Sequence, residues 1–118
     1  MPPAPKPPTS LSSSLVIAEH ASLTGTHLIT LGSNTVVHPR TKINSTFAPV
    51  TVRNNCIISE RSQIGLQSEP AEDQLHGVVI ENGVIIEVGA IVEASIVGEG
   101  SIIEVNAKIG KRAILGRV

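Results

Sequence analysis

Residues 31–48 read LGSNTV, VHPRTK and INSTFA, three consecutive units of six residues that each begin with an aliphatic side chain. Ile17 and Leu23 have the same six-residue spacing upstream, and the spacing continues downstream with a few interruptions. The later first positions are Val52, Ile58, Ile64, Ile80, Ile86, Val92, Val97, Ile103, Ile109 and Leu115. A repeat of fixed length indicates a solenoid, in which equivalent side chains of successive turns stack into one core.

The fourth and fifth positions of each unit indicate a tight corner. The fifth residue is usually small, as at Thr35, Thr41, Cys56, Ser62, Ser68, Val84, Ala90, Ser101, Ala107 and Ala113, with Phe47 as the exception. The fourth is often Asn or Gly, as at Asn34, Asn55, Gly83, Gly89, Gly100 and Asn106. Because these two residue types tolerate positive φ, each unit predicts a short strand followed by a bend, and three units close one triangular turn.

The composition supports strands. Of the 118 residues, 41% are hydrophobic, yet there is one Phe and no Tyr or Trp, so the core must consist of Ile, Val, Leu and Ala. Branched side chains of this kind fit a pleated surface better than a helix. We therefore predict an all-β, single-stranded parallel β-helix of hexapeptide repeats with about five coils. A β-sandwich with chance periodicity is the alternative.

The repeat also suggests how the chain is divided. Residues 1–14 hold five of the eight prolines and a serine cluster, which predicts a disordered tail. Residues 15–118 form the predicted β-helix, from which a polar loop over residues 66–78 is expected to extrude; it carries Glu69, Glu72, Asp73 and His76. The sequence stops inside a unit, so we expect the C-terminal cap to be missing or replaced by another chain.

Charge and apolar run length exclude several classes of partner. The net charge of −1 gives no reason to expect nucleic acid or an anionic membrane surface. No apolar run approaches the roughly 20 residues that span a bilayer. With one cysteine and no basic-then-apolar leader, a cytoplasmic setting is predicted.

The residues give weak support for catalysis. A zinc site needs about three converging imidazoles. The four histidines are His20, His27, His38 and His76, and no two of them stand at a short, fixed spacing that repeats in register. An acyltransferase needs a general base, for which His38 or His76 can be nominated without an assignable supporting carboxylate.

Other polar side chains have structural interpretations. Cys56, Ser62 and Ser101 occupy the small inward position and are interpreted as corner fillers. A basic C-terminal cluster follows an acidic series, which could steer a partner. The basic residues are Lys108, Lys111, Arg112 and Arg117, and the acidic ones are Glu81, Glu87, Glu93, Glu99 and Glu104. No catalytic, cofactor-binding or metal-binding residue is assigned.

The interruptions of the repeat carry a family resemblance. The nine-residue step through Ala48-Pro49-Val50, the loop over residues 66–78 and the five-residue step to Val97 each break the pattern of sixes. Together with the run over residues 31–43, and with VIENGVIIEVGA at residues 79–90, they resemble the dynactin subunit 6 family of β-helix subunits in the dynactin pointed-end complex. The resemblance covers residues 15–118.

The resemblance implies a left-handed β-helix and a non-catalytic subunit that helps dynein and dynactin engage cargo on microtubules. Implied partners are a sister β-helix subunit and other pointed-end subunits, with no small-molecule substrate and no cofactor, in the cytoplasm and cytoskeleton. Thr24-Gly25-Thr26 stands where many relatives have Arg-Gly-Asp, and the family's further coils and C-terminal helix are absent. The alternative function is a hexapeptide acyltransferase or a γ-class carbonic anhydrase-like enzyme.

Overall fold

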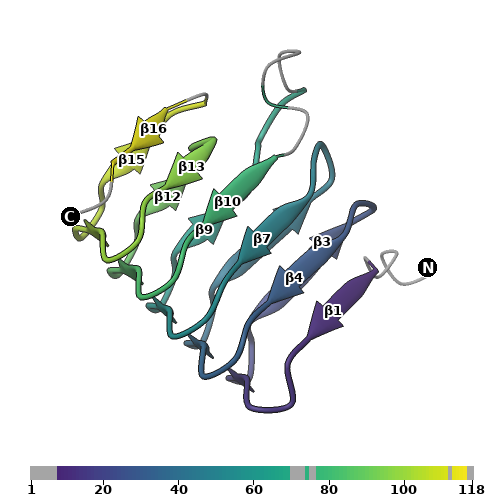
Figure 1. Cartoon of the computed structure of the whole chain (residues 1–118). Coiled ribbons are helices and arrows are strands. Elements are labelled where there is room, and N and C mark those ends of the chain that lie inside the picture. Colours follow the sequence, from purple (N-terminus) through teal and green to yellow (C-terminus); the bar gives the residue numbers. More distant parts are fainter. Residues whose placement is uncertain (1–7, 70–73, 75–76, 112, 117–118) are drawn as a thin grey trace.

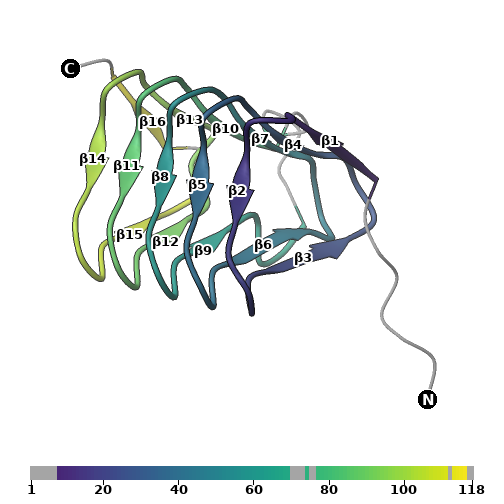
Figure 2. The same ribbon diagram turned by 90° about the horizontal axis from the view of Figure 1, so that it is seen from below.

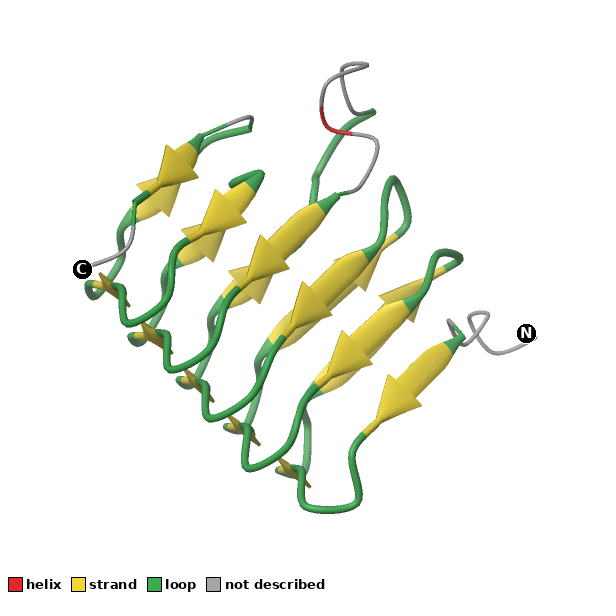
Figure 3. Cartoon of the chain, in the orientation of Figure 1, coloured by secondary structure: helices red, strands yellow, loops and turns green. Residues whose placement is uncertain are grey.

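The computed structural model describes residues 8–69, 74, 77–111 and 113–116, and it is a left-handed parallel β-helix of about five turns (Figure 1). The predicted all-β class is confirmed, and the β-sandwich is excluded because every strand pair is parallel. Strands and corners make up nearly all of the described chain (Figure 3). Each turn passes through three flat sheets that form the sides of a prism (Figure 2).

The three sheets take every third strand along the chain. Sheet A contains β1 (Thr9–Leu11), β4 (Ile29–Leu31), β7 (Val50–Val52), β10 (Val78–Ile80), β13 (Ile96–Val97) and β16 (Ile114–Leu115). Sheet B contains β2 (Val16–Ile17), β5 (Val36–Val37), β8 (Ile57–Ile58), β11 (Ile85–Ile86) and β14 (Ile102–Ile103). Sheet C contains β3 (Ser22–Gly25), β6 (Lys42–Ser45), β9 (Gln63–Ile64), β12 (Ile91–Val92) and β15 (Lys108–Ile109).

The aliphatic first positions of the repeat form the core. Val37 pairs in register with Ile58, and the same column continues through Ile86 to Ile103. The equivalent residues of sheets A and C stack in the same way, and the inner turns are almost fully buried. Since the side chains of a strand alternate between faces, the neighbour of each inward residue points to solvent. The predicted stacking into ladders is confirmed.

Small inward residues close the corners by hydrogen bonding to the next turn. Thr35 Oγ1 donates to the Arg53 carbonyl oxygen over 2.8 Å, and Ser62 Oγ donates to the Glu87 carbonyl oxygen over 2.9 Å. Among the described residues, no buried side-chain nitrogen or oxygen lacks a hydrogen-bond partner. The polar corner fillers are therefore satisfied inside the core. Ser68 differs from the expected pattern, because it is exposed in the loop after β9.

Two of the three corners are regular. The AB corner, which joins sheet A to sheet B, and the BC corner, which joins sheet B to sheet C, each use four residues between strands in every turn. The Asn and Gly residues predicted to bend have positive φ at both corners. They are Asn34, Asn55, Gly83 and Gly100 at the AB corner, and Gly89 and Asn106 at the BC corner.

All interruptions of the repeat fall at the third corner, the CA corner, which joins sheet C back to sheet A. The nine-residue step lies there, and Ala48 is buried while Phe47 is half-buried. The longest excursion follows β9, where Leu66 and Gln74 are buried and Gln74 Nε2 donates to the Glu93 carbonyl oxygen over 2.8 Å. The predicted loop residues Glu72, Asp73 and His76 lie outside the described residues.

Strand β1 lies inside the segment for which the sequence predicts a tail. Its residues Thr9–Leu11 pair with Ile29–Leu31 of β4, so the first turn of the β-helix begins at β1. The tail residues 1–7 lie outside the described residues. The division of the chain at residue 14 stays a prediction.

Candidate functional site

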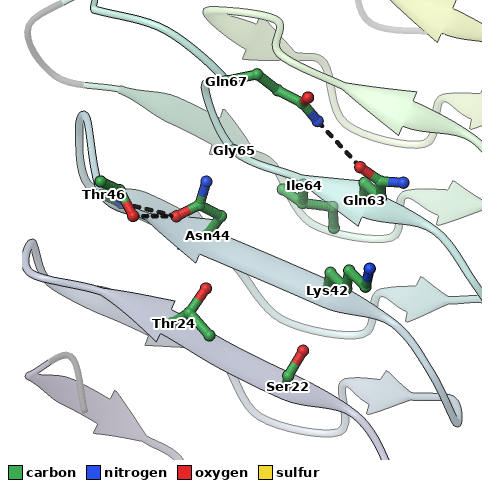
Figure 4. A pocket seen from close by; sticks show the side chains of 9 residues that line it. All are labelled: Ser22, Thr24, Lys42, Asn44, Thr46, Gln63, Ile64, Gly65 and Gln67. Atoms are coloured by element: carbon green, nitrogen blue, oxygen red, sulfur yellow. Dashed lines mark hydrogen bonds between the residues drawn. The ribbon is translucent and has the colours of Figure 1, made fainter. Parts of the chain in front are cut away.

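A groove runs along the outer face of sheet C, across β3, β6 and β9 (Figure 4). Its volume is about 440 Å³, and it is lined by Ser22, Thr24, Lys42, Asn44, Thr46, Gln63, Ile64, Gly65 and Gln67. A second hollow of about 350 Å³ is lined by His20, Ser22, Arg40, Lys42, Arg61 and Gln63. Because the two share Ser22, Lys42 and Gln63, they form one surface. We call the whole the sheet C groove and the second hollow its basic end.

The register of sheet C explains why the groove is polar. Ser22 pairs with Lys42, and Lys42 pairs with Gln63, so these three outward positions form one column across the sheet. Thr24 and Asn44 form a parallel column two residues further along the strands. Hydrogen-bonding side chains from three successive turns therefore point into one shallow hollow.

Local hydrogen bonds hold the groove walls in place. Asn44 Oδ1 accepts from the backbone nitrogen of Thr46 over 2.9 Å and from Thr46 Oγ1 over 2.6 Å, while Gln67 Nε2 donates to Gln63 Oε1 over 3.0 Å (Figure 4). Gly65 lies between these walls with φ of 125°, and a Cβ there would overlap the Asn44 carbonyl oxygen. A residue without a side chain is required at this point.

The basic end is built on a strained stretch of the BC corner. His20, Arg40 and Arg61 occupy the same place in three successive turns, with φ of 65°, 63° and 62°. A left-handed conformation costs a residue with a Cβ about 1–2 kcal/mol. The next two turns use Gly89 and Asn106 at the equivalent corner positions. Strained backbone of this kind concentrates at functional sites, which makes the basic end the candidate site.

The basic end is cationic. Glu60 lies between the two arginines, with Oε1 at 3.9 Å from Arg40 Nη1 and 4.0 Å from Arg61 Nε. All three side chains are well exposed, so these ion pairs contribute little stability. Within the described part of the chain, Lys42 has no carboxylate within 4.0 Å, and no acidic side chain lines the groove. Two guanidinium groups, one ammonium group and one imidazole can therefore meet an anion there.

The residues nominated from the sequence lie elsewhere. His38 is exposed at the BC corner but does not line the groove, and His76 falls outside the described residues, as do Arg112 and Arg117. From the sequence, His20 is considered only as a zinc ligand and is assigned no role. The available signal was the corner position itself, where His20, Arg40 and Arg61 replace Asn or Gly in three consecutive turns.

Cys56 is fully buried, as the small inward position predicts. Burial raises the pKa of its thiol, with a smaller contribution from the charge of Glu81, while hydrogen bonds from the backbone oppose this. The Sγ atom lies 3.0 Å from the Glu81 carbonyl oxygen. A buried, protonated thiol is a poor nucleophile, in agreement with the structural interpretation.

Across the residues that the structure describes, no three His, Cys, Asp or Glu side chains gather in a way that could hold a metal ion. The described chain also has no helix with the length and apolar character needed to cross a membrane.

Comparison with known proteins gives a distant structural likeness. No protein family and no curated protein matches the sequence. Among solved structures, the crystal structure of a Bacillus cereus protein described as a putative acetyltransferase matches 90% of this chain and 71% of its own length, with 22% sequence identity and a TM-score of 0.33. A likeness at this level transfers no activity by itself.

This finding corrects two expectations from the sequence. The identification with the dynactin pointed-end subunits is wrong, because the comparisons give no match to a dynactin subunit. The expectation of a non-catalytic chain is corrected with it, because that expectation was drawn from the same resemblance. What holds is the coarser statement, a hexapeptide-repeat β-helix. The expected partners and the cytoplasmic and cytoskeletal location stay predictions.

Proposed function

We propose that this chain is an acyltransferase whose acyl donor is a thioester on a phosphate-bearing carrier of the coenzyme A type. The observation that carries the proposal is the basic end of the sheet C groove, where His20, Arg40 and Arg61 hold strained corner positions beside Lys42. Strain maintained over three turns, at a corner where Gly and Asn also fit, favours a role for the side chains themselves.

The arginines and Lys42 would bind the phosphate groups of the donor. Guanidinium groups form paired, charge-assisted hydrogen bonds with phosphate oxygens, and ammonium groups add a point charge. Adjacent turns are about 4.8 Å apart, so cations from neighbouring turns can contact one diphosphate. The two arginines share Glu60 through long, exposed contacts that a phosphate can displace.

The rest of the groove suits the arm of such a donor. Asn44, Gln63 and Gln67 place amide groups along its wall, and Gly65 keeps its floor low. Amide side chains both donate and accept hydrogen bonds, which matches a chain of peptide-like linkages. Since His20 is also at the basic end, the arm would double back within the groove, so that the phosphates lie on the arginines and the thioester lies beside His20.

His20 would act as the general base. Its imidazole would take the proton from an acceptor hydroxyl or amine as the acceptor oxygen or nitrogen attacks the thioester carbonyl carbon. The new C–O or C–N bond forms, the C–S bond breaks, and the proton on His20 passes to the departing thiolate. Acyl ester or amide and free thiol are the products, so atoms and charge balance.

The test is turnover of acetyl-coenzyme A with a panel of hydroxyl and amine acceptors, measured by release of free thiol. His20→Asn should lower kcat by about a hundredfold or more, since a positioned base contributes roughly 10²–10⁴ in rate. Asn tolerates positive φ, so the fold should be preserved. The matched control is Asn106→His, at the equivalent corner outside the groove, which should leave turnover unchanged.

The outcomes separate catalysis from binding. Donor binding with turnover that does not depend on His20 would remove the assigned base. Saturable binding of acetyl-coenzyme A without turnover for any acceptor would reduce the site to an anion-binding surface. Absence of binding at millimolar donor would overturn the proposal.

A further inference from the structure

The outer face of sheet B carries a continuous aliphatic stripe. Val16, Val36, Ile57, Ile85 and Ile102 are paired in register across five neighbouring strands, which lie side by side in Figure 2. The exposed fractions of Val16, Ile57 and Ile102 are 57%, 39% and 58%. With strands about 4.8 Å apart, the stripe is about 19 Å long. We call these five residues the sheet B stripe.

The stripe is not a general property of outward positions in this repeat. The equivalent column of sheet C contains Ser22, Lys42, Gln63, Ile91 and Lys108, and that of sheet A contains Ser10, Thr30 and Thr51 before it becomes aliphatic at Val79, Ile96 and Ile114. Thr has the same strand preference as Val and Ile, so local propensity does not explain the loss of every polar side chain on sheet B. A contiguous aliphatic row on an open sheet face indicates an interaction surface.

Charge beside the stripe changes sign along the β-helix axis. The neighbouring column, at the first residue of the BC corner after each strand, contains Ala18, His38, Ser59, Glu87 and Glu104. The segment over residues 81–107 contains five glutamates and no Lys or Arg, whereas Arg40 and Lys42 belong to the second turn. The N-terminal turns are thus the more basic part, and the turns over residues 81–107 are the acidic part, ahead of the basic residues that begin at Lys108.

We propose that the sheet B stripe binds a second copy of this chain in antiparallel orientation, with a two-fold axis along β8. Rotation about the strand direction keeps each column opposite itself and reverses the order of the turns. Ile57 then faces Ile57 of the second copy, and Val36 faces Ile85 of the second copy. Val16 faces Ile102 of the second copy in the same way.

The charge pattern selects this orientation. In the antiparallel pair, His38 lies opposite Glu87 of the second copy, and the contact occurs twice because the interface is symmetric. A parallel pair has its two-fold axis along the β-helix, which reverses the strand direction, so Glu87 would lie opposite Gly83 of the second copy and meet no opposite charge. Complementary charge therefore fixes the register that the uniform stripe alone leaves open.

This inference is independent of the proposed enzymatic function. The stripe lies on sheet B, whereas the groove lies on sheet C, so a partner on one side of the prism leaves the other side open. Failure of one proposal does not decide the other.

The first experiment measures the oligomeric state of the full chain by sedimentation and light scattering over a range of concentrations. The expected species is a dimer. Ile57→Lys places two like charges on the two-fold axis and should shift the chain to monomer, with circular dichroism confirming that the strands remain. Thr51→Lys is the matched control, because it makes the same change at the equivalent outward position of sheet A in the same turn, and it should stay dimeric.

The second experiment tests the orientation by disulfide trapping in a Cys56→Ser background. Mixing His38→Cys chains with Glu87→Cys chains should yield the mixed disulfide as the main cross-linked product. Cross-links within each variant population, a trimer, or a monomer at every concentration would each overturn the proposal.

Discussion

The AB and BC corners solve the same backbone problem with different residues. Both bend the chain through a residue with positive φ in successive turns. The AB corner uses Asn34, Asn55, Gly83 and Gly100, residue types that adopt this conformation at low cost. Three turns of the BC corner use His20, Arg40 and Arg61 instead. The difference indicates that the residues of the AB corner serve the fold, whereas the side chains of the BC corner serve a function.

Replacing both arginines would break this comparison most strongly. Arg40→Asn combined with Arg61→Asn should weaken binding of acetyl-coenzyme A by at least about a hundredfold, because each charge-assisted contact contributes about 1.5–3 kcal/mol. The same change should raise the free energy of unfolding by about 1 kcal/mol through relief of strain. Calorimetric titration and urea unfolding give the two values.

Opposite signs in these two measurements are the decisive feature. The control is Arg53→Asn at the AB corner, which removes a 3.0 Å contact between Arg53 Nε and Glu81 Oε2 outside the groove and should not alter donor binding. A double variant that loses stability and keeps its affinity would contradict the functional interpretation of the BC corner.

A β-branched residue at the AB corner should show the conformational cost alone. Gly100 has φ of 78°, and a Cβ there would meet no atom within 4 Å. Gly100→Val should therefore lower the free energy of unfolding by about 2 kcal/mol without any steric overlap. Urea denaturation measures the loss, and Gly116→Val, in open space near the last described strand, serves as the control for side-chain size.

Moving an arginine to the AB corner sharpens the same point. Asn55→Arg gives that corner the residue type found at Arg61 in the same turn. The expected loss is about 1 kcal/mol of stability with no gain in affinity for acetyl-coenzyme A. Tighter donor binding by this variant would mean that arginine at any strained corner suffices, and the groove would lose its significance.

The smallest effect is expected at Cys56, next to the AB corner. Cys56→Ser should change stability by no more than about 1 kcal/mol, since Thr35 and Ser101 already place hydroxyl groups at equivalent positions and hydrogen-bond to carbonyl oxygens. The raised pKa of Cys56 adds a pH dependence. Its contribution to stability is full below the ordinary thiol pKa of 9.0 and is lost as pH rises through the higher folded value.

Urea denaturation between pH 8 and pH 11 checks this prediction. The wild-type chain should lose stability faster than Cys56→Ser as pH rises, because only the wild type must deprotonate a thiol on unfolding. Parallel pH profiles for the two proteins would show that burial of the thiol does not affect the free energy of unfolding.

The fold could be predicted from the sequence because the six-residue spacing marks which side chains are buried. Val37, Ile58 and Ile86 are spaced by the geometry of the turn, so the pattern predicted which residues stack. The groove left no such trace, since outward residues such as Lys42 and Gln63 are free to vary from turn to turn. Identification from the interruptions failed for a related reason, as every interruption falls at the CA corner, where length is least constrained.

The histidines illustrate the same limit. The sequence offered His38 or His76 as a base, whereas the groove is lined by His20. What distinguishes His20 is a backbone conformation shared with Arg40 and Arg61, and residue identity did not predict it. A left-handed backbone conformation is expected of Asn and Gly, so an arginine in the sequence does not predict one.

Confinement of every length change to the CA corner has a practical consequence for protein engineering. The steps there range from five residues before Val97 to the excursion that leaves β9, and the register of the remaining turns is unaffected. A foreign peptide inserted in this corner, for example between Thr46 and Phe47, would be displayed on one edge of a rigid prism. Its spacing from a second inserted peptide could be chosen in increments of one turn, about 4.8 Å, by selecting which turn receives it.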